Sequence, residues 1–376
     1  MKLAIGWCAA VIVAGLAGAA SAAPPVPDAV QRKKLIEFGW DEPDTAFLRK
    51  HLATMERNTP FDGCVFHVAW AGEAGRRGSF TWEGWSARAF GEAELAQSLA
   101  DLKATPFARM RHNFLRFNVT PGDVDWFDDA AFAPVLNNAK LAAKVAHDGG
   151  GCDGVLFDIE QYKHKLFRYP DQKHAGTKSW DDYAAQVRKR GRQVMDAFQE
   201  GYPDLVVMLT FAYSLPHSQT RGDPAKLARV DYGLLAPLLD GMVDAAAGKA
   251  KLVDGFELAY GYREPRQFAQ AYETMKSGVL PMVSADHGRY GKVISFSFGV
   301  WLDFNWRKLG WDETAPEKNY FSPKGFAGSV ARALETADEY VWVYSETPRW
   351  WGGDDARPVK LPEAYLTELR GVHRRP

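Results

Sequence analysis

The sequence contains little cysteine, no large excess of charge of either sign, and no linker, internal repeat or low-complexity tract. Lys and Arg total 46 and Asp and Glu total 47, which gives a formal net charge of −1. This balance argues against a general nucleic-acid-binding protein, which needs a basic excess or stripe. With 46% apolar and 25% charged residues among its 376, the chain can bury a sizeable core, which excludes wholesale disorder.

The sequence also lacks the motifs of several enzyme classes. It has no glycine-rich phosphate loop, no H-E-x-x-H motif and no cysteine-rich metal spacing. His67 and His112 stand alone in predicted strands, so we expect neither a metal nor a cofactor. G-x-S-x-G is absent, which argues against a serine hydrolase, and no predicted strand places a lysine inside a barrel for Schiff-base chemistry.

The first 22 residues have the pattern of a secretory signal peptide. Lys2 is followed by an apolar stretch, Leu3–Gly18, and by the small residues Ala20–Ala22 at the expected cleavage point. A membrane anchor is the alternative, but the apolar stretch is short for a membrane span. We therefore expect a secreted or periplasmic protein, with residues 23–376 as one catalytic domain and no membrane contact after cleavage.

Cysteine is too scarce in the remaining chain for a disulfide scaffold. Removal of the signal segment takes away Cys8 and leaves Cys64 and Cys152. These two either form a single bridge or, as we expect, are buried as small apolar side chains.

Short runs of β-branched and aromatic residues alternate with helical patterns eight times. The predicted strands are Lys34–Gly39, Gly63–Ala69, Asn113–Val119, Gly154–Glu160, Leu205–Ala212, Gly255–Tyr260, Val293–Trp301 and Tyr340–Ser345. Helices are expected at Thr45–Asn58, Glu92–Lys103, Ala130–His147, Leu234–Ala247, Pro265–Lys276 and Pro362–Val372, and after the capping residues Ser179 and Ser322. Eight such units predict a single (β/α)8 TIM barrel, with a doubly wound open sheet as the alternative.

Alternation along the fourth strand identifies the face that points into the barrel. Asp158 and Glu160 share one face, whereas Val155, Phe157 and Ile159 share the other. Two carboxylates against the helix layer would carry a large desolvation cost, so their face must be the lumen.

The same alternation in the other strands places further polar side chains inside. They are Arg116, Asn118, Glu257, Asp303 and Glu346. Lumen layers usually hold branched apolar residues, so acids there are kept to catalyse, to ligate or to pair. Arg116 is the one evident counter-charge, and a structural ion pair with Asp158 or Glu257 remains an alternative. Glu160 and Glu346 end their strands, where the active sites of this fold lie.

Aromatic residues, 13% of the chain, concentrate at and beyond the same strand ends. Those expected to contact substrate are Trp40, Trp70, Tyr162, Tyr213, Trp301, Tyr344, Trp350 and Trp351. Further tryptophans in the following loops are Trp82, Trp85, Trp126, Trp306 and Trp311, and we expect about half of all these tryptophans to pack beneath long loops. An aromatic floor with convergent acids is what an oligosaccharide groove requires. The predicted function is therefore secreted glycoside hydrolysis in polysaccharide degradation, with a non-catalytic carbohydrate-binding barrel as the alternative.

The segment Gly154–Tyr162, with Asp158 and Glu160 in an Asp-x-Glu arrangement, resembles the fourth-strand signature of glycoside hydrolase barrels, particularly family 18 chitinase-like enzymes. The resemblance implies that Glu160 is the general acid and Asp158 its partner in the lumen. It covers only this strand and the general barrel plan. The fuller signature has another acid where this chain has Leu156.

The second catalytic carboxylate has three candidates. Glu346, at the end of strand eight, is the one that we choose as base or nucleophile, with Asp303 next. Glu257 is expected to lie too deep and to orient other groups. Strands four and eight are opposite in the ring, which favours a wide carboxyl separation and inversion rather than retention. We also expect the crowded acids to raise at least one pKa, that of Glu160.

Overall fold

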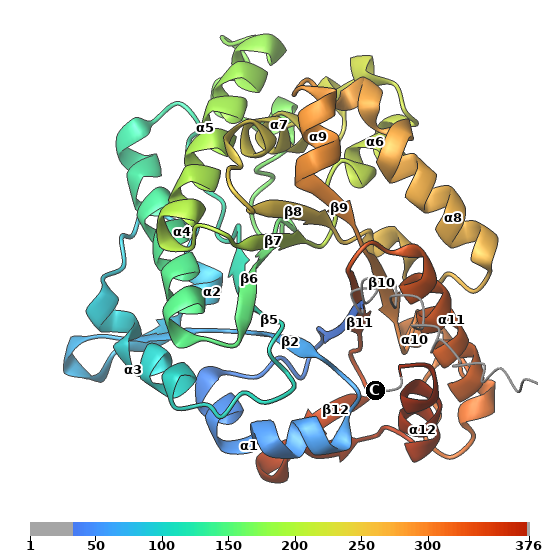
Figure 1. The fold of residues 1–376 in the computed structure, drawn as a ribbon. Coiled ribbons are helices and arrows are strands. Elements are labelled where there is room, and N and C mark those ends of the chain that lie inside the picture. Colours follow the sequence, from blue (N-terminus) through green and yellow to red (C-terminus); the bar gives the residue numbers. More distant parts are fainter. Residues whose placement is uncertain (1–32, 374–376) are drawn as a thin grey trace, which may run out of the picture. The chain divides into compact units, whose positions relative to one another are not determined.

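The computed structural model describes residues 33–373. The expected signal peptide lies outside the described residues. Nine strands form one parallel sheet in the order β10-β11-β1-β2-β5-β6-β7-β8-β9 (Figure 1). Their bounds are β1 Lys34–Glu37, β2 Gly63–Phe66, β5 Asn113–Asn118, β6 Cys152–Asp158, β7 Val206–Leu209, β8 Lys251–Asp254, β9 Ile294–Phe296, β10 Phe298–Trp301 and β11 Tyr340–Tyr344.

The sheet closes into a barrel through the seventh predicted strand. That strand is interrupted at Ser297, so it appears as β9 and β10. β9 pairs with β8 and β10 pairs with β11, which joins the two ends of the strand order. The fold is therefore the predicted TIM-type barrel.

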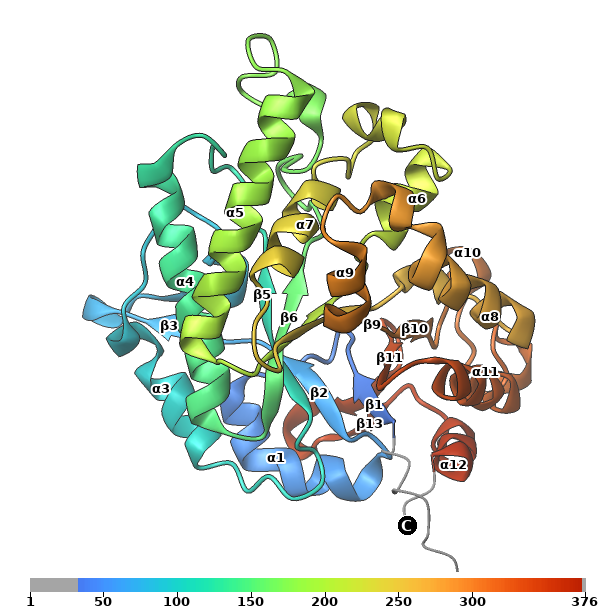
Figure 2. The same cartoon turned by 45° about the horizontal axis from the view of Figure 1, so that its top comes forward.

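Helices surround the sheet (Figure 2). They are α1 Thr45–Asn58, α2 Phe80–Glu83, α3 Glu92–Lys103, α4 Asp129–Gly149, α5 Trp180–Gly201, α6 Ser214–Thr220, α7 Leu235–Ala245, α8 Pro265–Glu273, α9 His287–Val293, α10 Trp306–Leu309, α11 Pro323–Thr336 and α12 Glu363–Val372. Ser179 and Ser322 cap α5 and α11 as predicted. Within residues 33–373, no helix is long and apolar enough to cross a membrane.

Two short antiparallel hairpins lie outside the barrel sheet. One pairs β3 (Ala69–Ala71) with β4 (Arg77–Ser79), and the other pairs β12 (Arg349–Gly352) with β13 (Arg357–Val359). Both belong to segments that follow the carboxyl ends of barrel strands, β2 and β11 respectively. They therefore extend the face on which active sites of this fold lie.

The sixth strand is displaced from its predicted position. β8 is Lys251–Asp254, whereas the predicted segment Gly255–Tyr260 leaves the sheet and forms a 3₁₀ helix at Glu257–Ala259. Phe256 has a φ of 41°, which no strand residue adopts. The two apolar residues of β8 lie between Lys251 and Asp254, so the sequence shows only a weak strand pattern there.

Apolar packing follows the predicted alternation. Val155 and Phe157 belong to the core between sheet and helices, whereas Leu156 belongs to a separate cluster inside the barrel. The interior cluster also contains Ile36, Phe38, Val65, Phe114, Val206, Met208, Val253, Tyr340 and Trp342. The barrel is thus filled by side chains below the level of the acids, as is usual for this fold.

Lysine side chains do reach the amino end of the barrel, which the sequence analysis did not anticipate. Lys34 is buried and pairs with Glu339 at 2.6 Å, and Lys251 pairs with the other oxygen of the same carboxylate. Both lysines begin their strands, at the end opposite to Glu160. They therefore close the bottom of the barrel and lie away from its mouth.

The two cysteines do not form a bridge. Cys64 is buried and Cys152 is partly exposed, and both are free thiols. The expectation of burial thus holds in full only for Cys64.

Phe157 offers a test of the core outside the sheet. It is fully buried and stacks on Trp85, with ring centroids 5.6 Å apart. Phe157→Ala should lower the free energy of unfolding by about 3–5 kcal/mol, because it removes apolar contacts and leaves a cavity. Urea denaturation measures the change. Leu309→Ala, at a side chain that is 60% exposed, is the control and should change it by less than about 0.5 kcal/mol. An equal effect of the two substitutions would contradict this packing.

Candidate active site

A cavity of about 540 Å³ lies at the carboxyl ends of the barrel strands. Three of the predicted acids line it: Glu160 after β6, Glu257 after β8 and Glu346 after β11. The size is that of cavities that hold small ligands. The fold thus brings together, at one opening, three carboxyl groups from distant parts of the sequence.

Asp158 and Asn118 lie just beneath this cavity and do not line it. Asp158 is fully buried, and its Oδ2 accepts hydrogen bonds from Arg116 Nε at 2.9 Å and Asn118 Nδ2 at 2.7 Å. Its Oδ1 accepts from the backbone N–H of Glu160 at 3.1 Å. Of the two ion pairs that the sequence left open for Arg116, the one with Asp158 therefore forms. Asp158 also holds the backbone of Glu160 in place.

Glu160 lies in surroundings that favour its protonated form. Burial and, after it, the charge of Asp158 raise the pKa of Glu160 from an ordinary 4.5 to about 7. The hydroxyl of Tyr162 donates a hydrogen bond to Oε2, which moderates this rise in pKa. A carboxyl group with this pKa holds a proton near neutral pH, as the sequence analysis expected.

Glu257 lies at the cavity and not deep in the barrel, which differs from the expectation. β8 ends at Asp254, so Glu257 comes after the strand, where its N–H donates to the Thr210 carbonyl at 3.0 Å. Its Oε2 is buried and has no hydrogen-bond partner among the described residues. Desolvation, then the charges of Glu160 and Asp158, raise the pKa of Glu257 well above its ordinary value.

Glu346 is surrounded by hydrogen-bond donors. Trp306 Nε1 donates to Oε2 at 2.6 Å, and Arg307 Nη1 donates to Oε1 at 3.2 Å. The hydroxyl of Tyr344 donates to Oε1 at 3.3 Å. Glu346 therefore forms an ion pair with a guanidinium group, which neither Glu160 nor Glu257 does among the described residues.

Asp303 does not line the cavity. Its two oxygens accept hydrogen bonds from the backbone N–H groups of Glu346 at 3.1 Å and Thr347 at 2.7 Å, and from Trp301 Nε1 at 2.7 Å. Asp303 thus fixes the chain that carries Glu346 and does not face a ligand.

Aromatic side chains form much of the cavity wall. Of those predicted to contact substrate, four line it: Trp40, Tyr162, Trp301 and Tyr344. Tyr260 stacks on Tyr344 with ring centroids 5.4 Å apart and an interplanar angle of 19°. Trp82 lies edge-to-face against Tyr162 at 5.3 Å, and the guanidinium of Arg116 lies 4.6 Å from its ring.

The other predicted aromatic contacts lie elsewhere. Tyr213 is fully buried and donates a hydrogen bond to Asp240 at 2.8 Å in the core outside the sheet. Trp350 is also fully buried and packs on Phe61. Trp351 is 1% exposed and donates its indole N–H to the Asp41 carbonyl at 2.8 Å. Tyr213 and Trp350 therefore fill space in the core, whereas Trp351 borders a separate cavity of about 810 Å³.

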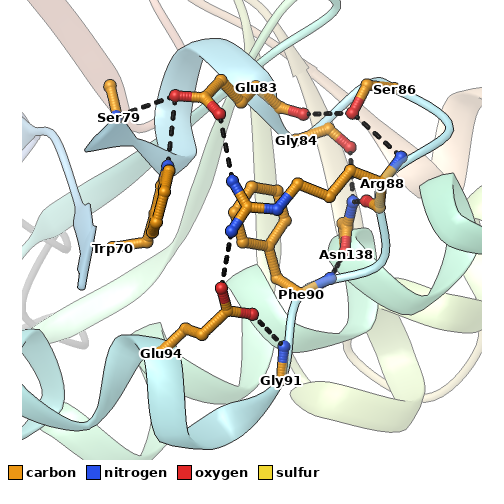
Figure 3. A network of polar contacts seen from close by, with 10 residues as sticks. All are labelled: Trp70, Ser79, Glu83, Gly84, Ser86, Arg88, Phe90, Gly91, Glu94 and Asn138. Carbon is orange, nitrogen blue, oxygen red and sulfur yellow. Dashed lines mark hydrogen bonds and ion pairs between the residues drawn. The ribbon is translucent and has the colours of Figure 1, made fainter. Parts of the chain in front are cut away.

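Trp70, in the β3–β4 hairpin, contacts Arg88 and Glu83 (Figure 3). Glu83 ends α2, the short helix that also carries Trp82. The guanidinium of Arg88 stacks 3.8 Å from the Trp70 ring and pairs with Glu94 at 2.6 Å and Glu83 at 3.4 Å. Trp70 Nε1 donates to the same Glu83 at 3.1 Å. Trp70 therefore positions the segment that carries Trp82 and does not line the cavity.

Several residues that line the cavity were not predicted as site residues, among them Glu42, Tyr260 and Arg307. Glu42 pairs with Arg116 at 2.8 Å, Arg307 pairs with Glu346, and Tyr260 stacks on Tyr344. Glu42 lies in the loop after β1 and Arg307 in the short helix α10, where strand alternation gives no information, whereas Tyr260 lies in the segment wrongly predicted as the sixth strand. Across residues 33–373, no group of three or more His, Cys, Asp or Glu side chains is placed to hold a metal ion.

No protein-family model and no curated protein matches this sequence. In structure, the chain is similar to an exo-beta-1,4-mannosidase from an Opitutaceae bacterium, with a TM-score of 0.48 and 12% identity over 92% of this chain and 62% of that one. It is also similar to a chitinase domain from Pyrococcus furiosus (TM-score 0.45, 8% identity, 91% and 95% covered). A glycoside hydrolase family 5 enzyme from Prevotella bryantii gives a TM-score of 0.46 and 9% identity, with 92% and 97% covered.

The chain spans less than two thirds of the mannosidase chain. With every reported TM-score below 0.5, these likenesses assign no family and no residue role.

Two substitutions should move the pKa of Glu160 in opposite directions from about 7. Asp158→Asn removes the neighbouring charge that raises this pKa, so the value should fall. Tyr162→Phe removes a hydroxyl that stabilises the carboxylate, so the value should rise. Carbon NMR titration of the glutamate carboxyls, assigned with Glu160→Gln, measures both. Shifts in the same direction would contradict the contacts described here.

The raised pKa of Glu160 also predicts a pH-dependent stability. Between pH 4.5 and about pH 7 the folded protein keeps a proton that the unfolded chain has lost, so the free energy of unfolding falls as the pH rises through this window. Glu160→Gln cannot titrate. The variant should therefore gain stability relative to the wild type as the pH rises through the window, and the gain should be absent below it. Urea unfolding below, within and above this range measures the difference.

Proposed function

We propose that the protein is a secreted glycoside hydrolase that cleaves a poly- or oligosaccharide, with Glu160 as general acid. The observation that carries the proposal is the convergence of Glu160, Glu257 and Glu346 on one cavity with aromatic walls. Glycoside hydrolysis needs a carboxyl group that holds a proton and a carboxylate that does not. Aromatic rings bind the apolar faces of sugar rings, while the acids bind their hydroxyl groups.

Glu160 supplies the proton in this mechanism. As the bond between the anomeric carbon and the glycosidic oxygen breaks, the Glu160 proton passes to the leaving oxygen. The carboxylate that remains is stabilised by the hydroxyl of Tyr162, which already donates to it. Asp158 acts through the backbone of Glu160, so it is a positioning residue.

Glu346 is the carboxylate partner in this proposal. Arg307 pairs with it and Trp306 donates a hydrogen bond to it. In an inverting reaction, it takes a proton from the water that attacks the anomeric carbon; in a retaining one, its oxygen attacks that carbon directly. In the retaining case, Glu160 then takes a proton from a water molecule whose oxygen attacks the anomeric carbon, so that the bond to Glu346 breaks and Glu160 is protonated again. In the inverting case, exchange with solvent restores the proton on Glu160 and removes the one on Glu346. Inversion is the outcome that we favour.

Glu257 is the second candidate for the partner. It lies beside Glu160 and has no ion pair among the described residues. A negative charge on Glu257 is therefore repelled by that of Glu160, whereas the charge of Glu346 is compensated by Arg307. The Glu257 carboxyl suits hydrogen bonding to a sugar hydroxyl better than attack on carbon. Substitution of each glutamate by glutamine distinguishes Glu257 from Glu346 as the partner.

Glu160→Gln and Glu346→Gln should each lower kcat by about 10²–10⁴-fold while leaving sugar binding nearly unchanged. The wild type is first given a panel of polysaccharides with product analysis, and the sugar that it cleaves is used for the variants. NMR of the fresh product gives its anomeric configuration. Glu317→Gln, at an exposed acid away from the cavity, is the matched control and should retain full activity.

Each alternative has its own outcome. Normal turnover by Glu346→Gln with a large loss in Glu257→Gln would transfer the partner role to Glu257. Binding of oligosaccharides without any product from the wild type would instead favour a non-catalytic carbohydrate-binding barrel.

A further inference from the structure

A second cavity, of about 810 Å³, adjoins the candidate active site. It lies between the first turns of α1 and the β12–β13 hairpin, and its lining includes Ala46, Arg349 and Val359. Three residues, Trp40, Glu42 and His67, line both this cavity and the smaller one that contains the acids. The two cavities are therefore neighbours that meet at Trp40.

Trp40 is exposed and yet held in place. Its side chain is 56% exposed, while its Nε1 donates to the hydroxyl of Tyr344 at 2.9 Å. Its backbone N–H donates to the Ser345 carbonyl at 2.9 Å. The guanidinium groups of Arg307 and Arg349 lie 5.5 and 5.6 Å from the ring centroid. A large aromatic ring that is fixed before a ligand arrives loses little conformational entropy on binding.

The charges around the second cavity indicate which kind of ligand it fits. Glu42 is engaged with Arg116 at 2.8 Å, and Arg49 pairs with Asp101 at 2.9 Å. Asp44 accepts the backbone N–H of Phe47 at 2.7 Å as the cap of α1. The lining carries four acids, Asp41, Glu42, Asp44 and Asp354, against the three bases Arg49, Lys50 and Arg349, so a phosphate or a carboxylated sugar meets no excess of positive charge. A neutral ligand with many hydroxyl groups suits this lining.

We propose that the second cavity binds neutral sugar units of the same glycan chain that is cleaved in the first, with the chain passing over Trp40. This inference rests on the proposed glycoside hydrolase function. Sugar binding in the second cavity would make the enzyme selective for long oligosaccharides. Binding energy from the remote sugars then contributes to kcat/KM at the reacting bond.

The test is a change of chain-length selectivity in a variant with the second cavity filled. Ala46 is exposed and is the second residue of α1, so Ala46→Trp fills this cavity without touching the smaller one. The matched control is Ala93→Trp, because Ala93 is exposed, is the second residue of α3 and lines neither cavity. Val359→Trp fills the cavity from the hairpin side if the α1 variant folds poorly.

The probes are β-1,4-linked oligomers of glucose, mannose, xylose and N-acetylglucosamine, from dimers to hexamers. Calorimetry with the Glu160→Gln protein measures affinity for every series, and kcat/KM is measured on the series that the wild type cleaves. The ratio of hexamer to dimer should fall by about tenfold in Ala46→Trp, in both affinity and kcat/KM, and should stay unchanged in Ala93→Trp.

The outcomes separate the two proposals. The second-cavity proposal is overturned, and the hydrolase proposal stands, if product forms with no dependence on chain length. The same conclusion follows if product forms but the hexamer-to-dimer ratio is unchanged in both Ala46→Trp and Val359→Trp. Length-dependent binding that Ala46→Trp abolishes, without product from the wild type, overturns the hydrolase and leaves the second binding site. Absence of both binding and product overturns both.

Discussion

The ion pair between Arg116 and Asp158 joins strands β5 and β6 inside the barrel, where apolar packing gives way to the cavity. A buried ion pair carries a desolvation cost that only good geometry and further hydrogen bonds offset. Here Asn118 and the N–H of Glu160 supply those bonds. Arg116 also reaches Glu42. The position of Glu160, the shape of the cavity floor and the Trp82 wall all follow from this one pair.

The cavity is electrostatically divided. Burial raises the pKa values of both Glu160 and Glu257, and so does neighbouring negative charge: that of Asp158 for Glu160, and those of Glu160 and Asp158 for Glu257. Glu346 lies against Arg307, which compensates its charge. A general acid needs surroundings that favour its protonated form, and Glu160 has them. Tyr344 links the two sides: its hydroxyl donates to Glu346, and the charge of Glu160 contributes to raising its pKa.

Strand alternation predicted the lumen correctly where polar and apolar residues strictly alternate, as they do around Asp158. It misplaced the sixth strand because β8 is short and bounded by Lys251 and Asp254, which hide its apolar pair. The error made Glu257 appear deep. Loops gave a weaker signal, because whether an aromatic side chain lines a cavity or fills a gap depends on its neighbours. Trp350 is fully buried and Trp40 is 56% exposed, although both follow strand ends.

Periodicity along single elements was enough to predict the barrel, the inward direction of Asp158 and the presence of acids at the strand ends. Which acids share a cavity is set by the tertiary structure, since it depends on the loops after β6, β8 and β11, which are remote in the chain. The tertiary structure also decided that Asp303 fixes the backbone and that Trp40 separates two cavities. Hydrogen bonding and desolvation act through space, and no local pattern in the sequence records them.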